Sequence, residues 1–191
     1  MDCAAGRGHP RLEEAGDPDT DMAAVTAPRP LTVEDDRTQF DCGRESLNNW
    51  FLRHAWDNHA GDVSRVNVIC DVVSGEIVGY VTLSAAQIER AFLSKAQQRN
   101  RPDPVPATLL SQLAIHKDHQ GQGHAASLLV FALRTSLRAA EIIGSTGVIA
   151  HPLDEGVRAF YAKWGFLDLP FDPRRAIFVR MVDLKKSGVV V

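Results

Sequence analysis

The chain has 191 residues, of which 45 % are hydrophobic and 24 % are charged, with a formal net charge of −3. These values are typical of one globular domain and exclude a chain that is disordered throughout. The charge is unevenly spread, because residues 1–36 hold nine Asp and Glu against three Arg, whereas residues 37–191 hold fifteen against eighteen Lys and Arg. The part of the chain that we expect to fold is therefore slightly basic.

The sequence contains no apolar run of membrane-spanning length and no basic-then-apolar leader, which predicts a cytoplasmic protein with no membrane partner. Its three cysteines, Cys3, Cys42 and Cys70, are widely spaced and form no CxxC pair. We therefore expect neither a disulfide framework nor a bound metal.

The amino-terminal residues differ in composition from the rest of the chain. Residues 1–30 are rich in Gly, Pro, Ala and Asp and show no hydrophobic periodicity, which predicts a disordered tail. Met22 is an alternative start within that tail. We expect a single domain at 31–186, followed by a loose end at 187–191.

The first half of the domain is predicted to hold short strands and two helices. A strand at 31–33 precedes a helix at 44–58, which Asp41 would cap. Strands at 63–71 and 77–85 follow, with Gly79 marking a bulge or a close approach. A helix at 87–100 and a stiff proline-rich connector at 102–106 complete this half. The first helix is expected to bury Leu47, Trp50, Phe51, His54 and Ala55.

The second half alternates strands with helices. A strand at 109–115 is followed by a glycine turn and a long amphipathic helix that runs from 125 to 140. A strand at 147–151, a helix at 154–163 and a last strand at 177–184 follow. Hairpins before and βα crossovers after the glycine turn predict an α/β fold with a mixed, mostly antiparallel sheet flanked by helices.

The glycine turn, Gln120-Gly121-Gln122-Gly123-His124-Ala125, opens the long helix. Free backbone N–H groups at the positive end of a helix dipole form an anion site, most often for phosphate. No Lys-Ser or Lys-Thr pair follows the turn, which excludes a Walker-type loop. The dinucleotide fingerprint is excluded because a charged linker separates the strand from the turn.

The Gln-x-x-Gly-x-Ala pattern of this turn resembles the acetyl-CoA pyrophosphate loop of the GNAT N-acetyltransferases. A second segment about 35 residues later, with Phe160, Tyr161, Gly165 and Phe166 in the pattern FYxxxGF, resembles the closing motif of the same superfamily. The resemblance implies the GNAT fold, acetyl-CoA as cosubstrate and transfer of an acetyl group to an amine.

Further segments are similar to the acetyltransferase toxins of type II toxin–antitoxin systems: FDCG at 40–43, LNxW at 47–50, PDPVP at 102–106, QLAI at 112–115 and the segment from HPLDE at 151 to GF at 166. The resemblance covers about 150 residues. It implies acetylation of the amino group of aminoacyl-tRNA, which blocks translation. It also implies a small DNA-binding antitoxin as partner and allows a homodimer.

The resemblance also implies roles for individual residues. Tyr161 would be the catalytic acid, the glycine turn would hold the CoA pyrophosphate, and the strand before it would pair with the pantetheine arm. The implied cofactor-binding residues are Leu113, Ala114, Ile115, Gln120, Gly121, Gln122, Gly123, His124, Ala125 and Ala126. A tyrosine suits the role, because it is protonated at neutral pH and can protonate the departing thiolate.

No general base stands out in the sequence. His116 and His151 are the nearest histidines to the proposed site, and water relayed through backbone carbonyls is the alternative. Contacts with RNA phosphates require Lys and Arg. The candidates are Arg90, Lys95, Arg99 and Arg101, supported by Arg134, Arg138, Arg174, Arg175, Lys185 and Lys186.

Two other functions remain open on the sequence. The first is acetylation of a small amine or of a protein amino group, for which an acidic acceptor pocket containing Asp103 or Glu141 would be required. The second is a non-catalytic acyl-CoA-binding or antitoxin-binding module, which the presence of Tyr161 argues against.

Overall fold

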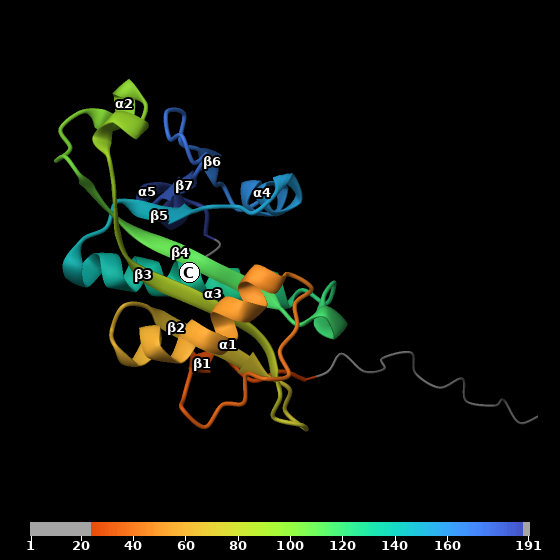
Figure 1. Ribbon diagram of the computed structural model, residues 1–191. Helices are drawn as coiled ribbons and strands as arrows, with labels where there is room; N and C mark the ends of the chain where they lie inside the picture. The colour runs from red at the N-terminus through yellow and green to blue at the C-terminus, as the bar shows by residue number, and fades with distance from the viewer. Residues whose placement is uncertain (1–23, 189–191) are drawn as a thin grey trace, which may run out of the picture.

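One sheet of seven strands runs through residues 24–188, the part of the chain that the computed structural model describes (Figure 1). The strands lie in the order β1-β2-β3-β4-β5-β7-β6. They are β1 (Arg29–Pro30), β2 (Arg65–Cys70), β3 (Ile77–Ile88), β4 (Val105–Ile115), β5 (Gly147–Ala150), β6 (Leu167–Asp168) and β7 (Ile177–Arg180). The helices are α1 (Glu45–Ala60), α2 (Lys95–Gln98), α3 (His124–Ile143), α4 (Glu155–Ala162) and α5 (Met181–Lys186), with short 3₁₀ turns η1 (Arg90–Phe92) and η2 (Lys117–His119).

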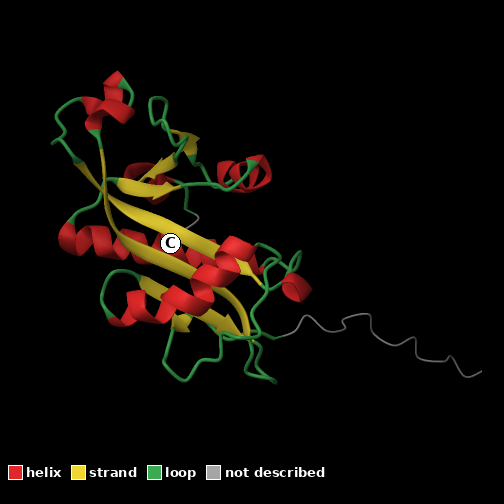
Figure 2. Cartoon of the chain, in the orientation of Figure 1, coloured by secondary structure: helices red, strands yellow, loops and turns green. Residues whose placement is uncertain are grey.

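The pairing of the strands confirms the predicted mixed sheet. The β4–β5 pair is parallel, and the pairs β1–β2, β2–β3, β3–β4, β5–β7 and β6–β7 are antiparallel. The parallel pair requires a crossover, which α3 supplies. Figure 2 shows the strands as a continuous twisted sheet between helices.

Helices α1 and α3 cover opposite faces of the sheet (Figure 1). Helix α3 is held by a stripe of fully buried side chains that follows its predicted periodicity, and α1 by Phe51 and Ala55. The ring of Phe51 stacks on Tyr80 of β3, with centroids 4.1 Å apart. His54 was expected on the buried face of α1 but is exposed, because the packing of α1 against the sheet is centred on Phe51 and Ala55 and does not extend to it. The buried residues of the α3 stripe are Leu128, Leu129, Ala132 and Leu133.

Strand pairing begins earlier in the chain than the sequence predicts. Val25 forms a bridge with Asp71, and Arg29 and Pro30 pair with β2, so the first strand lies at 29–30 rather than at 31–33. Pairing with the edge of β2 holds residues that the composition alone assigns to a tail. Met22 and the rest of residues 1–23 lie outside the described residues, as do residues 189–191 of the expected loose end.

The predicted helix at 87–100 is wrong over most of its length. Strand β3 continues to Ile88, which pairs with Val105, and only η1 and the four-residue α2 are helical in this segment. Ile88 and Leu93 are buried in a cluster with Val105. Pairing with β4 therefore extends the strand beyond the point where the local pattern would end it.

The predicted last strand at 177–184 ends at Arg180, which pairs with Gly147 at the start of β5. Beyond that pair no strand of the described chain continues the ladder, and Met181 to Lys186 form α5. Met181 and Leu184, three residues apart, are buried in the same cluster as α3. Spacing of three residues places both on one helical face.

Three further observations concern the described residues. No helix among them is both long enough and apolar enough to cross a membrane. They contain no group of three or more His, Cys, Asp or Glu side chains arranged for a metal ion. Cys42 and Cys70 are buried free thiols, and Cys3 lies outside the described range.

Candidate active site

Strands β4 and β5 separate after only three pairs. Thr108 to Leu110 pair with Val148 to Ala150, after which β4 continues to Ile115 with no strand of residues 24–188 paired to it on that side. A cavity of about 580 Å³ occupies the resulting gap. Its walls come from the second half of β4, the loop before α1, the end of β5 and one side of α4. This volume suits a small-molecule or cofactor site.

Tyr161 of α4 lines the cavity, and 5 % of its surface is exposed. Phe160 and Phe166 pack edge-on against its ring. Burial raises the pKa of the Tyr161 hydroxyl well above the usual value of about 10, so the group is protonated at neutral pH. No hydrogen bond from another described residue occupies this hydroxyl. It is therefore available as a proton donor.

Asp154 positions Tyr161 by beginning α4. Its Oδ1 accepts a hydrogen bond from the backbone N–H of Val157 at 2.9 Å, as a helix cap does. Its Oδ2 accepts a hydrogen bond from the guanidinium of Arg44 at 2.5 Å. Arg44 also lines the cavity, so this ion pair joins the beginning of α1 to the beginning of α4 beside the gap.

Strand β4 carries an irregularity where it leaves β5. Thr82 pairs with Gln112, but Leu83 pairs with Leu110, so Ser111 is an extra residue in the ladder. Such a bulge redirects the backbone and is frequent beside active sites. The predicted residues Leu113, Ala114 and Ile115 follow the bulge, and all three line the cavity. Their backbone groups face a gap in which an extended ligand can pair with the strand.

The glycine turn has the conformation that an anion site requires. Gly121 and Gly123 adopt positive φ values of 78° and 85°, and Gly123 precedes the first residue of α3. No side chain caps the helix and no acidic residue lies in its first turn. The first N–H groups of a 20-residue helix are thus free to bind phosphate oxygens.

The predicted cofactor-binding residues divide into two groups. Gln120 and Ala125 line the cavity together with the β4 residues. The others lie beyond the cavity wall, Gly121, Gln122 and Gly123 on the turn and His124 and Ala126 in the first turn of α3. The side chain of His124 points inward, with 6 % exposed, and burial lowers its pKa. The ring of His124 therefore packs in the interior, which leaves only its backbone available to a ligand.

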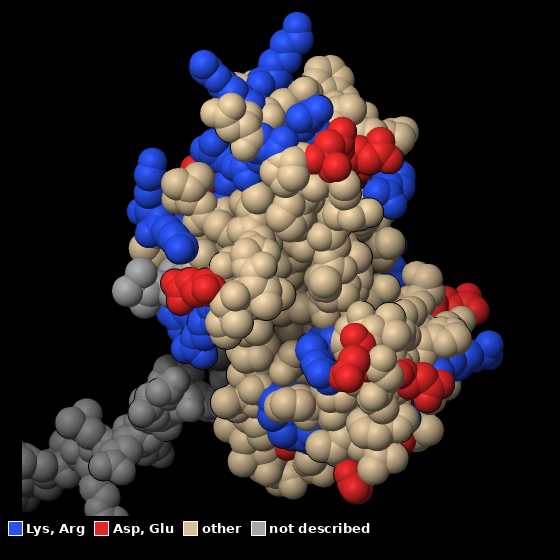
Figure 3. All heavy atoms as spheres, turned by 90° about the vertical axis from the view of Figure 1, so that its left-hand side faces the viewer, with Lys and Arg blue, Asp and Glu red and all other residues tan. Residues whose placement is uncertain are grey.

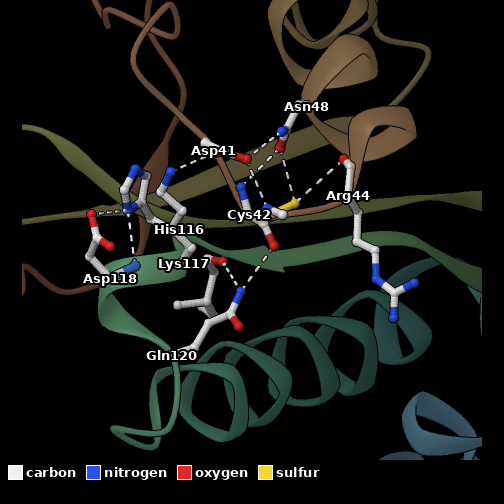
Figure 4. Close-up of polar contacts among 10 residues, drawn as sticks. Asp41, Cys42, Arg44, Asn48, His116, Lys117, Asp118 and Gln120 are labelled. Carbon is white, nitrogen blue, oxygen red and sulfur yellow. Dashed lines mark hydrogen bonds and ion pairs between the residues drawn. The ribbon is translucent and has the colours of Figure 1, made fainter.

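A network of hydrogen bonds fastens the loop before α1 to the segment after β4 (Figure 4). The Gln120 amide donates to the carbonyls of Cys42 and Ile115 at 3.0 and 2.9 Å. Asp41 pairs with Lys117 at 3.0 Å and accepts from Asn48 at 2.7 Å. Asp41, predicted as a helix cap, instead joins these two segments, because Arg44 occupies the position before α1. The network brings the loop residues 42–44 to the cavity.

The two histidines considered as bases lie in different places. His151 follows β5 directly and lines the cavity that contains Tyr161. His116 instead borders a second cavity of about 320 Å³, and its Nδ1 accepts a hydrogen bond from the backbone of Asp118 (Figure 4). Partial burial lowers the pKa of His151, and the positive charge of Arg174 lowers it further.

The predicted RNA-binding residues lie between β3 and β4, away from the cavity wall. Lys and Arg side chains gather over this part of the surface, at the top of Figure 3. The guanidinium of Arg90 donates a hydrogen bond to the carbonyl of Arg101, and its Nε lies 3.9 Å from Oδ2 of Asp103. Lys95, Arg99 and Arg101 form no ion pair within residues 24–188, and Lys95 and Arg99 are exposed. These cations are available to an anionic partner.

Sequence reasoning missed the contribution of the loop before α1 and of the first turn of that helix. Cys42, Arg44 and Leu47 line the cavity, although they are far from β4 in the sequence. No local periodicity or turn pattern marks them as site residues. The only signal was the FDCG and LNxW resemblance, which covers residues 40–50 without assigning them a role.

The comparisons with known proteins agree with this geometry. The acetyltransferase (GNAT) domain family matches residues 63–167, which include β4, the glycine turn and α4. A tRNA-acetylating toxin of Mycobacterium tuberculosis is 36 % identical over 152 residues, covering 80 % of this chain and 90 % of the toxin.

Two solved structures share the fold. AtaT complexed with acetyl-methionyl-tRNAfMet is 30 % identical, with a TM-score of 0.80 over 86 % of this chain and 99 % of that chain. A tyrosine-to-phenylalanine mutant of the toxin AtaT, bound to the C-terminus of the antitoxin AtaR and acetyl-CoA, is 27 % identical, with a TM-score of 0.73 over 86 % and 98 %.

Proposed function

The chain belongs to the GNAT acetyltransferase family, and we propose that it is a toxin that transfers the acetyl group of acetyl-CoA to the amino group of an aminoacyl-tRNA and so blocks translation. The observation that carries the proposal is one cavity that is lined by the free edge of β4 and by Tyr161 and reaches the beginning of α3. The tRNA-acetylating relative, similar over most of both chains, supports aminoacyl-tRNA as the acceptor.

Acetyl-CoA would lie along this path. The backbone N–H groups from Gly121 to Ala126 would bind the pyrophosphate at the positive end of α3. The pantetheine arm would pair with Leu113 to Ile115 along the edge that β5 leaves free. A backbone N–H of β4 would then polarise the thioester carbonyl as negative charge develops on its oxygen.

Tyr161 supplies the proton that the leaving group needs. The amine nitrogen attacks the thioester carbon, the C–S bond breaks, and the sulfur takes the proton of the Tyr161 hydroxyl. The raised pKa of Tyr161 keeps this proton in place until thiolate forms beside it. The products are the acetylated amine and free CoA.

The wall of the cavity argues against a small polycationic amine as acceptor. No acidic residue of the described chain lines it. Asp103 lies near Arg90, and Glu141 lies 3.9 Å from Lys185, so neither candidate faces the site. An aminoacyl-tRNA needs no carboxylate in the pocket, because its phosphates would bind the exposed cations Lys95 and Arg99.

The partners follow from the same proposal. A substrate used in translation places the protein in the cytoplasm. The structure of AtaT with the C-terminus of AtaR supports a small antitoxin as the protein partner of this chain. Growth arrest on expression, relieved by the product of the neighbouring gene, would support this partnership. A homodimer is compatible with the proposal.

The test is acetyl transfer from labelled acetyl-CoA to charged tRNA by the purified protein, compared with Tyr161→Phe. We expect label in aminoacyl-tRNA, and a loss of roughly 10²- to 10⁴-fold in the variant. Tyr80→Phe is the matched control, because Tyr80 lies outside the cavity and its hydroxyl bonds to the carbonyl of Leu47. No label from the wild type, with acetyl-CoA still bound, would refute aminoacyl-tRNA as acceptor.

A further inference from the structure

His151 lies at the point where the two central strands separate. Ala150, the residue before it, makes the last pair with β4, at Leu110. His151 therefore borders the gap from the β5 side, and Tyr161 borders it from α4. The ring thus shares the cavity in which the thioester carbonyl would lie.

The other groups of the cavity wall are unsuited to accepting a proton. No Asp or Glu of the described chain lines the cavity. The Cys42 thiol is kept protonated because burial raises its pKa, and its Sγ lies 3.1 Å from Oδ1 of Asn48. Arg44 is permanently charged. His116 is excluded by its position, because it borders the second cavity.

The surroundings of His151 favour the neutral ring. Partial burial lowers its pKa, and Arg174 lowers it further, whereas Asp172 acts in the opposite direction. Arg44 and Tyr161 are the other ionisable groups with His151 in the cavity wall, apart from the Cys42 thiol. A neutral imidazole has one free nitrogen lone pair, which can accept a proton at neutral pH.

We propose that His151 is the general base that takes a proton from the attacking amine, an inference that rests on the proposed function. The amine nitrogen bonds to the thioester carbon and gives one N–H proton to the imidazole. The C–S bond breaks, and the sulfur takes the proton of Tyr161. Imidazolium and tyrosinate then return to their starting states by proton exchange with water.

The test compares the pH dependence of kcat for the wild type, His151→Gln and His116→Gln, with labelled acetyl-CoA and charged tRNA. We expect His151→Gln to lower kcat at neutral pH by about 10²-fold and to remove one inflection from the acidic side of the profile. Its affinity for acetyl-CoA should be unchanged. His116→Gln should retain the wild-type profile. Added imidazole should restore part of the activity of His151→Ala, which a purely structural role does not allow.

The outcomes separate the two proposals. A wild-type enzyme that acetylates charged tRNA, with kcat and pH profile unaffected by His151→Gln, would refute the role of His151 alone. A wild-type enzyme that binds acetyl-CoA but acetylates no charged tRNA would refute the proposed acceptor and, with it, this step. Loss of activity in His151→Ala without rescue by imidazole, together with an unchanged inflection in His151→Gln, would assign His151 a structural role.

Discussion

The side-chain amide of Gln120 donates a hydrogen bond to the backbone carbonyl of Cys42 at 3.0 Å, across 78 residues of sequence. The same amide donates to Ile115 at the end of β4. One side chain thus fixes the loop before α1, the end of β4 and the beginning of the glycine turn relative to one another. The glutamine of the turn organises the cavity through its side chain, while the following residues offer their backbone.

Replacing Gln120 by Glu should therefore weaken acetyl-CoA binding. The carboxylate places oxygen atoms against two carbonyl oxygens in place of a donor, so both hydrogen bonds are lost. At about 0.5–1.5 kcal/mol for each bond, we expect the Kd for acetyl-CoA to rise about tenfold. Titration calorimetry with acetyl-CoA measures the change.

Gln39→Glu is the control for the charge change, because Gln39 is exposed and lies outside the wall of the larger cavity. It should bind acetyl-CoA as the wild type does. An unchanged Kd in Gln120→Glu would show that the loop and the turn keep their positions without this amide.

The sequence predicts those parts of the site whose signals are local. The periodicity of α3, the glycines of the turn and the beginning of α4 near Asp154 are all marked by residues within or next to the feature itself. Strand β3 was predicted too short because its extension to Ile88 depends on pairing with Val105. Cys42 and Arg44 were missed for the same reason, since a hydrogen bond from Gln120 brings their loop to the cavity.

The exposed cations between β3 and β4 should contribute to tRNA binding through charge alone. The double variant Lys95→Ala/Arg99→Ala removes two cations that have no ion-pair partner within residues 24–188. We expect weaker binding, and a slope of log K against log salt that is smaller by about 1 to 2. Fluorescence titration with charged tRNA at several salt concentrations measures both.

The matched control is Arg53→Ala/Lys163→Ala, which also removes one Arg and one Lys from exposed positions of the described chain, on α1 and just after α4. In this variant the slope of log K against log salt should lie closer to the wild-type slope than it does in Lys95→Ala/Arg99→Ala. Equal slopes for both double variants would mean that the segment between β3 and β4 makes no specific contribution.

A further expectation concerns stability at acidic pH. The guanidinium of Arg29 donates two hydrogen bonds to Asp35, at 2.8 and 2.6 Å, and lowers the pKa of that carboxyl to about 2. Because the pKa of Asp35 in the folded protein lies below its ordinary value of 3.8, this stabilisation is present above pH 4 and is lost as the pH falls toward 2. Solvent screens the pair, since 39 % of the Arg29 side chain is exposed, so we expect about 1 kcal/mol.

Asp35→Asn should remove this part of the pH dependence, as urea unfolding at pH values from 2 to 5 would show. Glu34→Gln provides the control, because it removes a neighbouring exposed carboxylate for which no ion pair occurs within the described residues. If Asp35→Asn and the wild type lost stability equally over this range, the Arg29 pair would not be its cause.

Gly147 at the beginning of β5 should tolerate no side chain. A Cβ atom there would overlap the carbonyl oxygen of Val179 and the ring of Phe178, both on the neighbouring β7. The carbonyl belongs to the backbone of a paired strand and cannot rotate away. We therefore expect Gly147→Ala to lower the free energy of unfolding by about 3 kcal/mol, measured by urea titration.

Gly156→Ala adds the same methyl group at a position where a single side-chain oxygen must shift by a few tenths of an ångström. Gly156 lies in α4, and a Cβ there would meet only Oδ1 of Asp154, at 3.2 Å. Since Ala is a better helix former than Gly, the variant should be equally stable or more stable, by up to about 1 kcal/mol. Gly147→Ala and Gly156→Ala should therefore change the free energy of unfolding in opposite directions or by clearly different amounts. Equal unfolding midpoints would mean that β5 and β7 can move apart at Gly147, and that the end of the cavity formed by β5 is not rigid.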